Sequence, residues 1–233
     1  MTNIKESIEN IRKSIVEVCQ KSGRNPDDVM LLAVTKTVDV DIIEDAINYG
    51  ITQVGENKPQ ELKRKYEILG DKVKWHQIGS LQSNKVKYII DKVELIHSLD
   101  RVSLAEEIDA RAKNIGRTIN CLVQVNISGE ESKHGLDPDE AVEFIKKCSK
   151  NYKNIKIKGL MTMAPYDVEE DEIRKIFRGL KNLSIKIENE KIHNIDMTEL
   201  SMGMSGDYKI AIEEGATIVR IGTSLFGKRN YNV

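Results

Sequence analysis

Lys36 is the residue of this 233-residue chain with the clearest potential for covalent chemistry. It follows the apolar run 29–34 (VMLLAV), which is typical of a strand buried on both faces. Leu32, Val34 and Lys36 alternate, so an inward-facing strand would carry the amine into a dry interior that favours its uncharged form. An uncharged amine attacks an aldehyde carbon to form an imine. On position alone, however, a lysine after a strand is more often a solvated loop residue.

Arg220 strengthens this interpretation. It alternates with Ile218 and Gly222 on one face of the last apolar run. An inward guanidinium cannot lose its proton and needs an acceptor, which could be a carboxylate or the ring nitrogen of a bound ligand. Enzymes that use pyridoxal phosphate place an Asp or Arg at that nitrogen, beside a lysine that forms a Schiff base.

Two segments could bind the phosphate of such a ligand. Residues 201–207 (SMGMSGD) and 222–224 (GTS) follow the last two apolar runs and are rich in small residues. Small residues let backbone N–H groups approach an anion, and a helix start adds positive potential. Each segment alone is also an ordinary turn, but a lysine, an arginine and two such loops at consistent places favour one site.

The elements that must position these residues repeat along the chain. Apolar runs begin at residues 51, 73, 95 and 119, at intervals of 22, 22 and 24 residues, and amphipathic stretches separate them. This interval fits one strand, a loop and a helix. We expect strands at 29–34, 51–55, 73–79, 95–99, 119–127, 155–163, 195–202 and 216–221. We expect helices around Ala46, ending at Gly50, and at 59–69, 84–93, 101–115, 137–150, 169–190 and 207–214.

Strict alternation predicts an α/β fold with a parallel sheet, and eight strands fit a closed (β/α)₈ barrel of the TIM type. The alternative, an open doubly wound sheet, is weaker because no nucleotide fingerprint follows the first strand. An apolar stripe from Ile4 to Val18 predicts an extra N-terminal helix within residues 1–23. Without a linker or a change of composition, we expect one domain over residues 1–233.

In a barrel of this kind the active site lies at the carboxyl ends of the strands. The residues at those ends, most of which are polar, are Lys36, Asn57, Gly79, Ser80, Ser98, Asp100, Asn126, Thr162, Ser201, Gly222 and Thr223. His76 and His97 lie on adjacent expected strands and could approach each other, but we interpret them as core residues because no metal-ligand spacing accompanies them. Residues 222–228 match GxxxxGK, but Arg229 replaces the Ser or Thr of a nucleotide-binding loop.

Composition excludes several classes of protein. The chain has 36 Lys and Arg against 37 Asp and Glu, so it lacks the cationic excess of a general nucleic-acid binder. Three scattered cysteines favour neither a disulfide scaffold nor a zinc site. No signal-peptide core or apolar run of membrane-spanning length is present. We therefore expect a cytoplasmic protein without a metal, a membrane or a nucleic-acid partner.

The chain resembles the YggS/PROSC family of pyridoxal phosphate homeostasis proteins, which share the N-terminal barrel of alanine racemase (PLP fold type III). The matching segments cover essentially the whole chain in the family's order: LLAVTK, GEN, WHQIGSLQSNK, SKHG, GLM, LSMGMSGD and VRIGTSLFG. The resemblance implies pyridoxal 5'-phosphate (PLP) as cofactor, held as an internal aldimine at Lys36. Further cofactor-binding residues that it implies are Asn57, Lys133, Met202, Ser205, Arg220, Gly222 and Thr223. One departure is Gln77, where the family usually has a large apolar residue.

Two functions compete, and a third possibility is a barrel that binds a partner enzyme and uses PLP only as a signal. The first is a carrier that holds and buffers PLP inside the cell and delivers it to PLP-dependent apo-enzymes. The second is an amino-acid racemase or another weak PLP-dependent enzyme. In alanine racemase-like enzymes the second catalytic base comes from a C-terminal β-domain in a dimer, whereas here six residues follow Gly227. We therefore expect a monomeric carrier without assigned catalytic residues.

Overall fold

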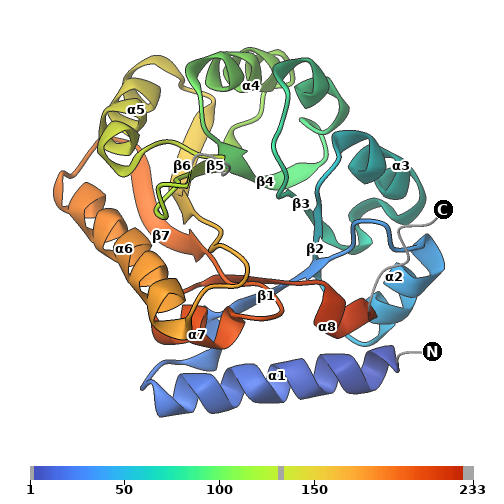
Figure 1. Ribbon diagram of the computed structural model, residues 1–233. Helices are drawn as coiled ribbons and strands as arrows, with labels where there is room; N and C mark the ends of the chain where they lie inside the picture. The colour runs from blue at the N-terminus through green and yellow to red at the C-terminus, as the bar shows by residue number, and fades with distance from the viewer. Residues whose placement is uncertain (1–2, 131–133, 228–233) are drawn as a thin grey trace.

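Short apolar strands alternate with helices along the whole chain and close into a barrel. The computed structural model describes residues 3–130 and 134–227. Eight parallel strands, β1 to β8, pair in chain order, and β8 pairs with β1 to close the ring, as Figure 1 shows. The strands are β1 Met30–Val34, β2 Gln53–Glu56, β3 Lys74–Gln77, β4 Val93–Leu99, β5 Ile119–Gln124, β6 Ile155–Met161, β7 Ile195–Ser201 and β8 Ile218–Ile221. The expected (β/α)₈ barrel is confirmed.

Helices surround this ring and cover its outer face (Figure 1). The α-helices are α1 Ile4–Lys21, α2 Val40–Asn48, α3 Pro59–Leu69, α4 Val102–Asn114, α5 Pro138–Asn151, α6 Glu170–Asn189, α7 Tyr208–Glu213 and α8 Thr223–Phe226. Short 3-10 helices are η1 Pro26–Asp28, η2 Gly70–Lys72 and η3 Ser83–Tyr88.

The helix expected at 84–93 is wrong in type and length. The structure has only η3, and Ile89 leaves the helical region with φ −126° and ψ −15°. Val86, Ile89, Ile90 and Val93 have helical spacing and are buried, which produced the expectation. Val93, however, is already the first residue of β4, so too few residues remain for three α-helical turns.

The strands separate two apolar cores. Inward-facing Leu32, Leu95, Leu122, Met161 and Ile218 form a small cluster inside the barrel. The opposite faces of the strands pack against the helices in a larger outer core that includes Ala33, Val54 and Val123. Because successive side chains of a strand point to opposite faces, Leu32 inside and Ala33 outside fix the direction in which Val34 and Lys36 point.

The closing pair of strands brings the two predicted cations to one end of the barrel. In the register of β1 with β8, Leu32 pairs with Arg220 and Ala33 with Ile221. Lys36 follows the end of β1, and Gly222 follows the end of β8. Both segments therefore emerge side by side at the carboxyl ends of the strands.

The N-terminal helix lies outside the ring, beside α7 and α8 (Figure 1). Its stripe of Ile8, Ile11 and Ile15 is buried, as its spacing predicts. Ser14 accepts a hydrogen bond from the Tyr208 hydroxyl at 2.8 Å, which joins α1 to α7. This helix thus covers the seam where the barrel closes.

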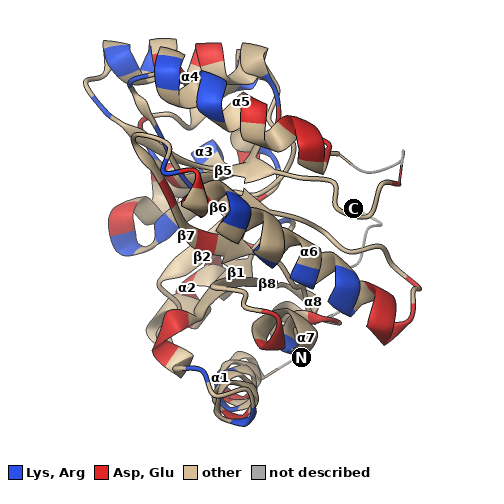
Figure 2. Ribbon diagram, turned by 90° about the vertical axis from the view of Figure 1, so that its left-hand side faces the viewer, with Lys and Arg blue, Asp and Glu red and all other residues tan. Residues whose placement is uncertain are grey.

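Charged residues lie mainly on the outer helices, whereas the strands carry few, as Figure 2 shows. Helix α6, for example, carries Arg174, which forms ion pairs with Glu170, Glu213 and Glu214. None of the described helices is both long and apolar enough to cross a membrane.

Gly159 is required by close approach of two strands. Its φ is +152°, and a Cβ placed there would lie 1.8 Å from the Glu199 carbonyl oxygen of β7. No side chain fits that space, so glycine lets β6 and β7 approach at this point.

Candidate functional site

A cavity of about 440 Å³ lies at the carboxyl ends of the strands. Its size falls within the range of about 300–1,000 Å³ usual for small-molecule sites. The lining residues are Val34, Lys36, Asn57, Ile78, Gly79, Ser80, Gln124, His134, Met163, Tyr166, Met204, Ser205, Gly206, Arg220, Gly222 and Thr223. Two of them are cations, Lys36 and Arg220, and none of the described lining residues is Asp or Glu. The cavity therefore favours an anionic ligand.

The half-buried Lys36 stands between two clamped neighbours. On one side, Thr35 donates its hydroxyl to Glu56 Oε1 at 2.6 Å, and its carbonyl accepts from Lys65 Nζ at 2.7 Å. On the other side, the Thr37 backbone N–H donates to a carboxylate of α3 at 2.8 Å, while Thr37 has a φ of +60°. A residue with a β-branched side chain rarely adopts that conformation, so these bonds hold an unfavourable turn in place.

One fully buried lysine, Lys65 of α3, connects both clamps. Its ammonium donates to Glu56 Oε1 and to Glu61 Oε1, each at 2.8 Å. Burial raises the pKa of Glu56 above its ordinary value, although Lys65 opposes the shift. Burial also acts to raise the pKa of Glu61, but hydrogen bonds from Lys65 and Thr37 lower it below its ordinary value. A buried charge network thus fixes the segment that presents Lys36.

Arg220 lies beneath the cavity and is 4% exposed. Its guanidinium donates to Ser201 Oγ at 2.6 Å and to the Thr162 carbonyl at 2.9 Å. Burial lowers the pKa of Arg220 to about 10, and the nearby Asp207 carboxylate opposes the shift. The side chain therefore remains a cation at neutral pH. Both acceptors are neutral groups. Of the two acceptors expected for an inward Arg220, a carboxylate or a ligand ring nitrogen, the carboxylate is therefore not bonded directly to it.

The two glycine- and serine-rich segments meet at the same cavity. Ser205 Oγ accepts hydrogen bonds from the backbone N–H groups of Gly222 and Ser224, each at 3.3 Å. These bonds are long, so both N–H groups can donate more strongly to an anionic oxygen. A Cβ at Gly206 would meet no atom within 4 Å, so the cavity is open on that side. The segments fit a phosphate group.

Asn57 and Gly79 form the opposite wall. A Cβ at Gly79 would lie 2.5 Å from the Asn57 carbonyl oxygen, so the two strand ends are in close contact. Gln77 is fully buried and donates its amide to the carbonyls of Asn57 and Gly79, at 2.8 and 3.1 Å. Gln77, the residue that departs from the family pattern, therefore joins the two strand ends that form this wall.

Most of the sequence-derived site residues come together, but not all. Lys36, Asn57, Ser205, Arg220, Gly222 and Thr223 line the cavity as a set. Met202 is fully buried in the outer core and is not among the lining residues. Lys133 lies outside the described residues, next to His134, which lines the cavity.

Several lining residues were not proposed as cofactor-binding residues from the sequence. Val34 could have been found, because it shares the inward face of Lys36. Gln124 ends β5 and is buried with its amide donating to the His134 carbonyl at 3.0 Å. Tyr166 comes from the loop between β6 and α6, where no periodic pattern indicates direction.

The two histidines meet inside the barrel, as the sequence suggested. His76 Nδ1 lies 2.9 Å from His97 Nε2, and both rings are buried. Across residues 3–130 and 134–227, no group of three or more His, Cys, Asp or Glu is arranged to hold a metal ion. Cys19, Cys121 and Cys148 are free and buried.

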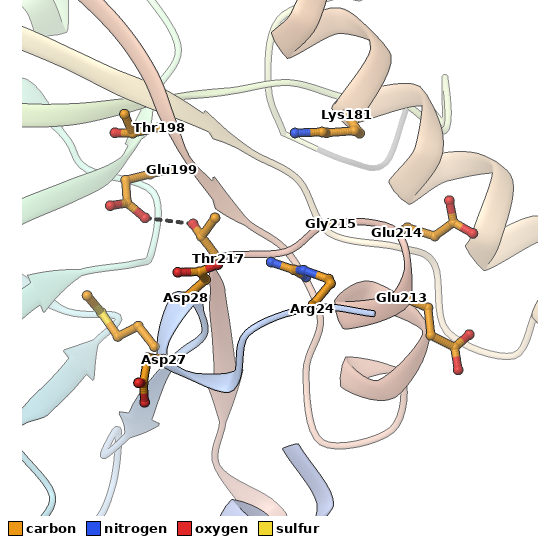
Figure 3. A pocket seen from close by; sticks show the side chains of 11 residues that line it. Arg24, Asp27, Asp28, Lys181, Thr198, Glu199, Glu213, Glu214, Gly215 and Thr217 are labelled. Carbon is orange, nitrogen blue, oxygen red and sulfur yellow. Dashed lines mark hydrogen bonds between the residues drawn. The ribbon is translucent and has the colours of Figure 1, made fainter. Parts of the chain in front are cut away.

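A second cavity, of about 720 Å³, lies at the other end of the barrel (Figure 3). Asp27 and Asp28 precede β1, and Thr217 precedes β8. Acidic side chains outnumber basic ones in its lining, and Thr217 donates to Glu199 at 2.6 Å. Although larger, this cavity sets five carboxylates against the two cations Arg24 and Lys181 among its described lining residues, so it does not favour an anionic ligand as the cavity at the carboxyl ends does.

Comparison with known proteins agrees with the fold. Residues 7–230 match the family model described as the N-terminal domain of alanine racemase. A pyridoxal phosphate homeostasis protein of Aquifex aeolicus is 44% identical over 98% of this chain and 100% of its own length.

Two solved structures are similar over nearly the whole chain. A protein from Bifidobacterium adolescentis described as unknown has a TM-score of 0.92 and 36% identity, covering 97% of both chains. PipY of Synechococcus elongatus, solved with PLP bound, has a TM-score of 0.85 and 32% identity, covering 97% of this chain and 100% of PipY. The chain belongs to the alanine racemase N-terminal domain family and, within it, to the group of the pyridoxal phosphate homeostasis proteins.

Proposed function

We propose that this protein binds pyridoxal 5'-phosphate in the cavity at the carboxyl ends of the strands and holds it covalently through Lys36. It thereby buffers the cofactor and delivers it to apo-enzymes. The proposal is supported by the names of its relatives and by PipY, which has been solved with PLP bound.

One observation carries the proposal: an amine, a guanidinium and a cluster of backbone donors line one cavity without a carboxylate among the described lining residues. The cofactor supplies an aldehyde, which condenses with an amine and releases water. Lys36 supplies that amine from a segment fixed on both sides. The N–H groups of Gly222 and Ser224 bind phosphate oxygens, and Arg220 donates to the ring nitrogen.

The charge of Arg220 favours holding the cofactor over amino-acid chemistry. A fixed cation beside the ring nitrogen disfavours protonation of that nitrogen. The ring then withdraws electrons less strongly and stabilises a carbanion less well. Racemisation of an amino acid passes through such a carbanion, whereas a carrier does not need it. A weak racemase remains the alternative function, and Tyr166 and His134 are lining residues with the chemistry to serve as its second acid–base group. A chiral assay over the common L-amino acids distinguishes the two.

The remaining features of the proposal concern the setting of the protein. We propose that it acts in the cytoplasm as a monomer made of one domain. Reactive aldehydes condense with many cellular amines, so a protein that covers the aldehyde limits this loss. Activation of a separately prepared apo-enzyme by the loaded protein would test delivery.

The direct test of binding is a titration of the purified protein with PLP, followed by visible absorption. We expect a band of the protein-bound cofactor in the wild type, and its loss in Lys36→Ala. Lys58→Ala is the matched control, because Lys58 is an exposed neighbour of the site and is not among the cavity-lining residues. A band that survives in Lys36→Ala but disappears in another lysine variant would show that the covalent residue is a different one.

A further inference from the structure

A row of polar side chains crosses the barrel interior beneath Arg220, and all of them are buried except Gln53, which is half-buried. Ser201 Oγ lies 2.9 Å from His97 Nδ1, and His97 Nε2 lies 2.9 Å from His76 Nδ1. His76 Nε2 in turn lies 2.9 Å from Gln53 Oε1. These four residues come from β7, β4, β3 and β2, and none of them is among the residues that line the cofactor cavity.

The two ends of the row fix the direction of every hydrogen bond. A guanidinium has donors only, so Ser201 Oγ accepts from Arg220. The hydroxyl proton of Ser201 then points to His97 Nδ1, which makes His97 Nε2 the protonated nitrogen. His97 donates from Nε2 to His76 Nδ1, and His76 donates from Nε2 to the side-chain amide oxygen of Gln53. Ser201, His97 and His76 each accept one bond and donate one, all in the same direction, and Gln53 accepts the last.

The opposite direction fits less well. It would require the Gln53 amide to donate to His76 and each histidine to carry its proton on Nδ1. Ser201 Oγ would then accept from both Arg220 and His97. The Ser201 proton would lack an acceptor among the described contacts, and a buried donor without an acceptor is costly.

Both rings must be neutral for the row to work, because an imidazolium donates from both nitrogens and accepts at neither. Burial favours that state. It lowers the pKa of His76 to about 3, and it lowers the pKa of His97 well below its ordinary value, with the charge of Arg220 adding to the effect.

We propose that Gln53, His76, His97 and Ser201 form one directed hydrogen-bond chain that positions the Arg220 guanidinium against the ring nitrogen of the cofactor. The contact with the cofactor rests on the proposed function, whereas the chain itself does not. These four residues are positioning residues, and they extend the cofactor site through the barrel. Gln53 and His76 line a small cavity of about 140 Å³ that also includes residues of the amino-terminal halves of the strands.

The first test uses the protein without cofactor. Long-range 1H–15N NMR of a protein labelled in its histidines reports which ring nitrogen carries the proton. We expect His76 and His97 to be neutral Nε2–H tautomers at neutral pH, with assignment from the single variants His76→Gln and His97→Gln. An Nδ1–H tautomer or an imidazolium at either residue would overturn the directed chain, whatever the protein binds.

The second test measures the effect on the bound cofactor. In His97→Leu the chain is interrupted, and we expect a shifted absorption maximum and about tenfold weaker PLP binding, the size of one lost hydrogen bond. His97→Gln should restore both to nearly wild-type values, because an amide accepts from Ser201 and donates to His76. An unchanged spectrum and Kd in folded His97→Leu would refute the positioning role.

A variant at the far end separates this role from simple damage to the core. Gln53→Leu removes the last acceptor without touching the cofactor cavity, and we expect a smaller shift in the same direction and about threefold weaker binding. Asn120→Leu is its control, because Asn120 lines the same small cavity outside the chain. Equal effects of the two variants would contradict the proposal even if His97→Leu fails to fold. If the wild type binds no PLP, the proposed function fails while the NMR result still decides the chain.

Discussion

Replacing the buried lysine behind the site, Lys65→Met, should destabilise the protein in a way that depends on pH. In the wild type the ammonium compensates Glu56, whose side chain is fully buried. Without it the carboxylate is left as an uncompensated buried charge, which typically costs about 3–5 kcal/mol. The Thr35 carbonyl also loses the donor that lies 2.7 Å away.

The carboxylate can limit this cost by taking up a proton. From the ordinary Glu value of 4.5, protonation at about pH 7 costs about 3.5 kcal/mol, at about 1.4 kcal/mol per pH unit. At about pH 5.5 the same step costs about 1.4 kcal/mol. Because the folded-state pKa of Glu56 is raised, the protonated form stabilises the variant at low pH, and this stabilisation is lost as pH rises. The penalty of Lys65→Met should therefore shrink by up to about 2 kcal/mol between about pH 7 and 5.5.

Urea unfolding followed by the fluorescence of the single, buried Trp75 measures this penalty. Lys65→Met combined with Glu56→Gln should recover more than half of the loss, because the fully buried carboxylate is then removed as well. Lys63→Met is the control on the same helix: its ion pair with Glu67 is exposed, and we expect a change below about 0.5 kcal/mol. A penalty of Lys65→Met below about 1 kcal/mol, or one that does not fall with pH, would refute the reasoning.

Three further predictions concern the histidines, the glycines and the phosphate loop. Burial lowers the pKa of His76 to about 3 and also lowers the pKa of His97. Below about pH 6.5 the unfolded chain therefore binds protons that the folded chain does not, and the free energy of unfolding decreases as pH falls. Urea titrations at different pH values measure how steeply the unfolding free energy changes with pH. Between about pH 6 and 5 this slope should be smaller in His97→Gln than in the wild type by about 1.4 kcal/mol per pH unit. An unchanged slope would contradict a neutral His97 ring in the folded protein. Gly79→Ala, whose Cβ meets a carbonyl at 2.5 Å, should lower Tm and weaken PLP binding, whereas Gly206→Ala, with no atom within 4 Å, should keep the wild-type Tm. Ser205→Ala should weaken binding of PLP about tenfold but weaken binding of pyridoxal much less, because only PLP carries the phosphate. Absorption titration measures both affinities, and equal losses would exclude a role of Ser205 in phosphate binding.

Much of the fold could be predicted because strands buried on both faces leave a simple pattern. Apolar runs indicated all eight strands, although only those from residue 51 to 119 recur at a regular interval. Alternation around Leu32 and Ile218 gave the direction of Lys36 and Arg220. The failure at 84–93 has a physical cause: helical spacing of apolar residues also arises when a short turn leads into a buried strand.

The parts of the site that escaped prediction depend on contacts between distant segments. Lys65 lies three residues after Leu62 and four before Leu69, so its position on the buried face of α3 was detectable. Glu61 is its i−4 neighbour on the same helix, but its contacts with Glu56 and Thr35 follow only from the packing of α3 against the ends of β2 and β1. Tyr166 reaches the cavity from a loop, where side-chain direction has no periodic signal, whereas Gln124 alternates with inward-facing Leu122 and could have been found.

The most direct measurement of the central claim is borohydride reduction of the protein loaded with pyridoxal phosphate, followed by peptide mapping. We expect one modified residue, Lys36, with unmodified Lys58 as the internal reference. A reduced adduct on another lysine, or none under saturating cofactor, would contradict covalent binding at the end of β1.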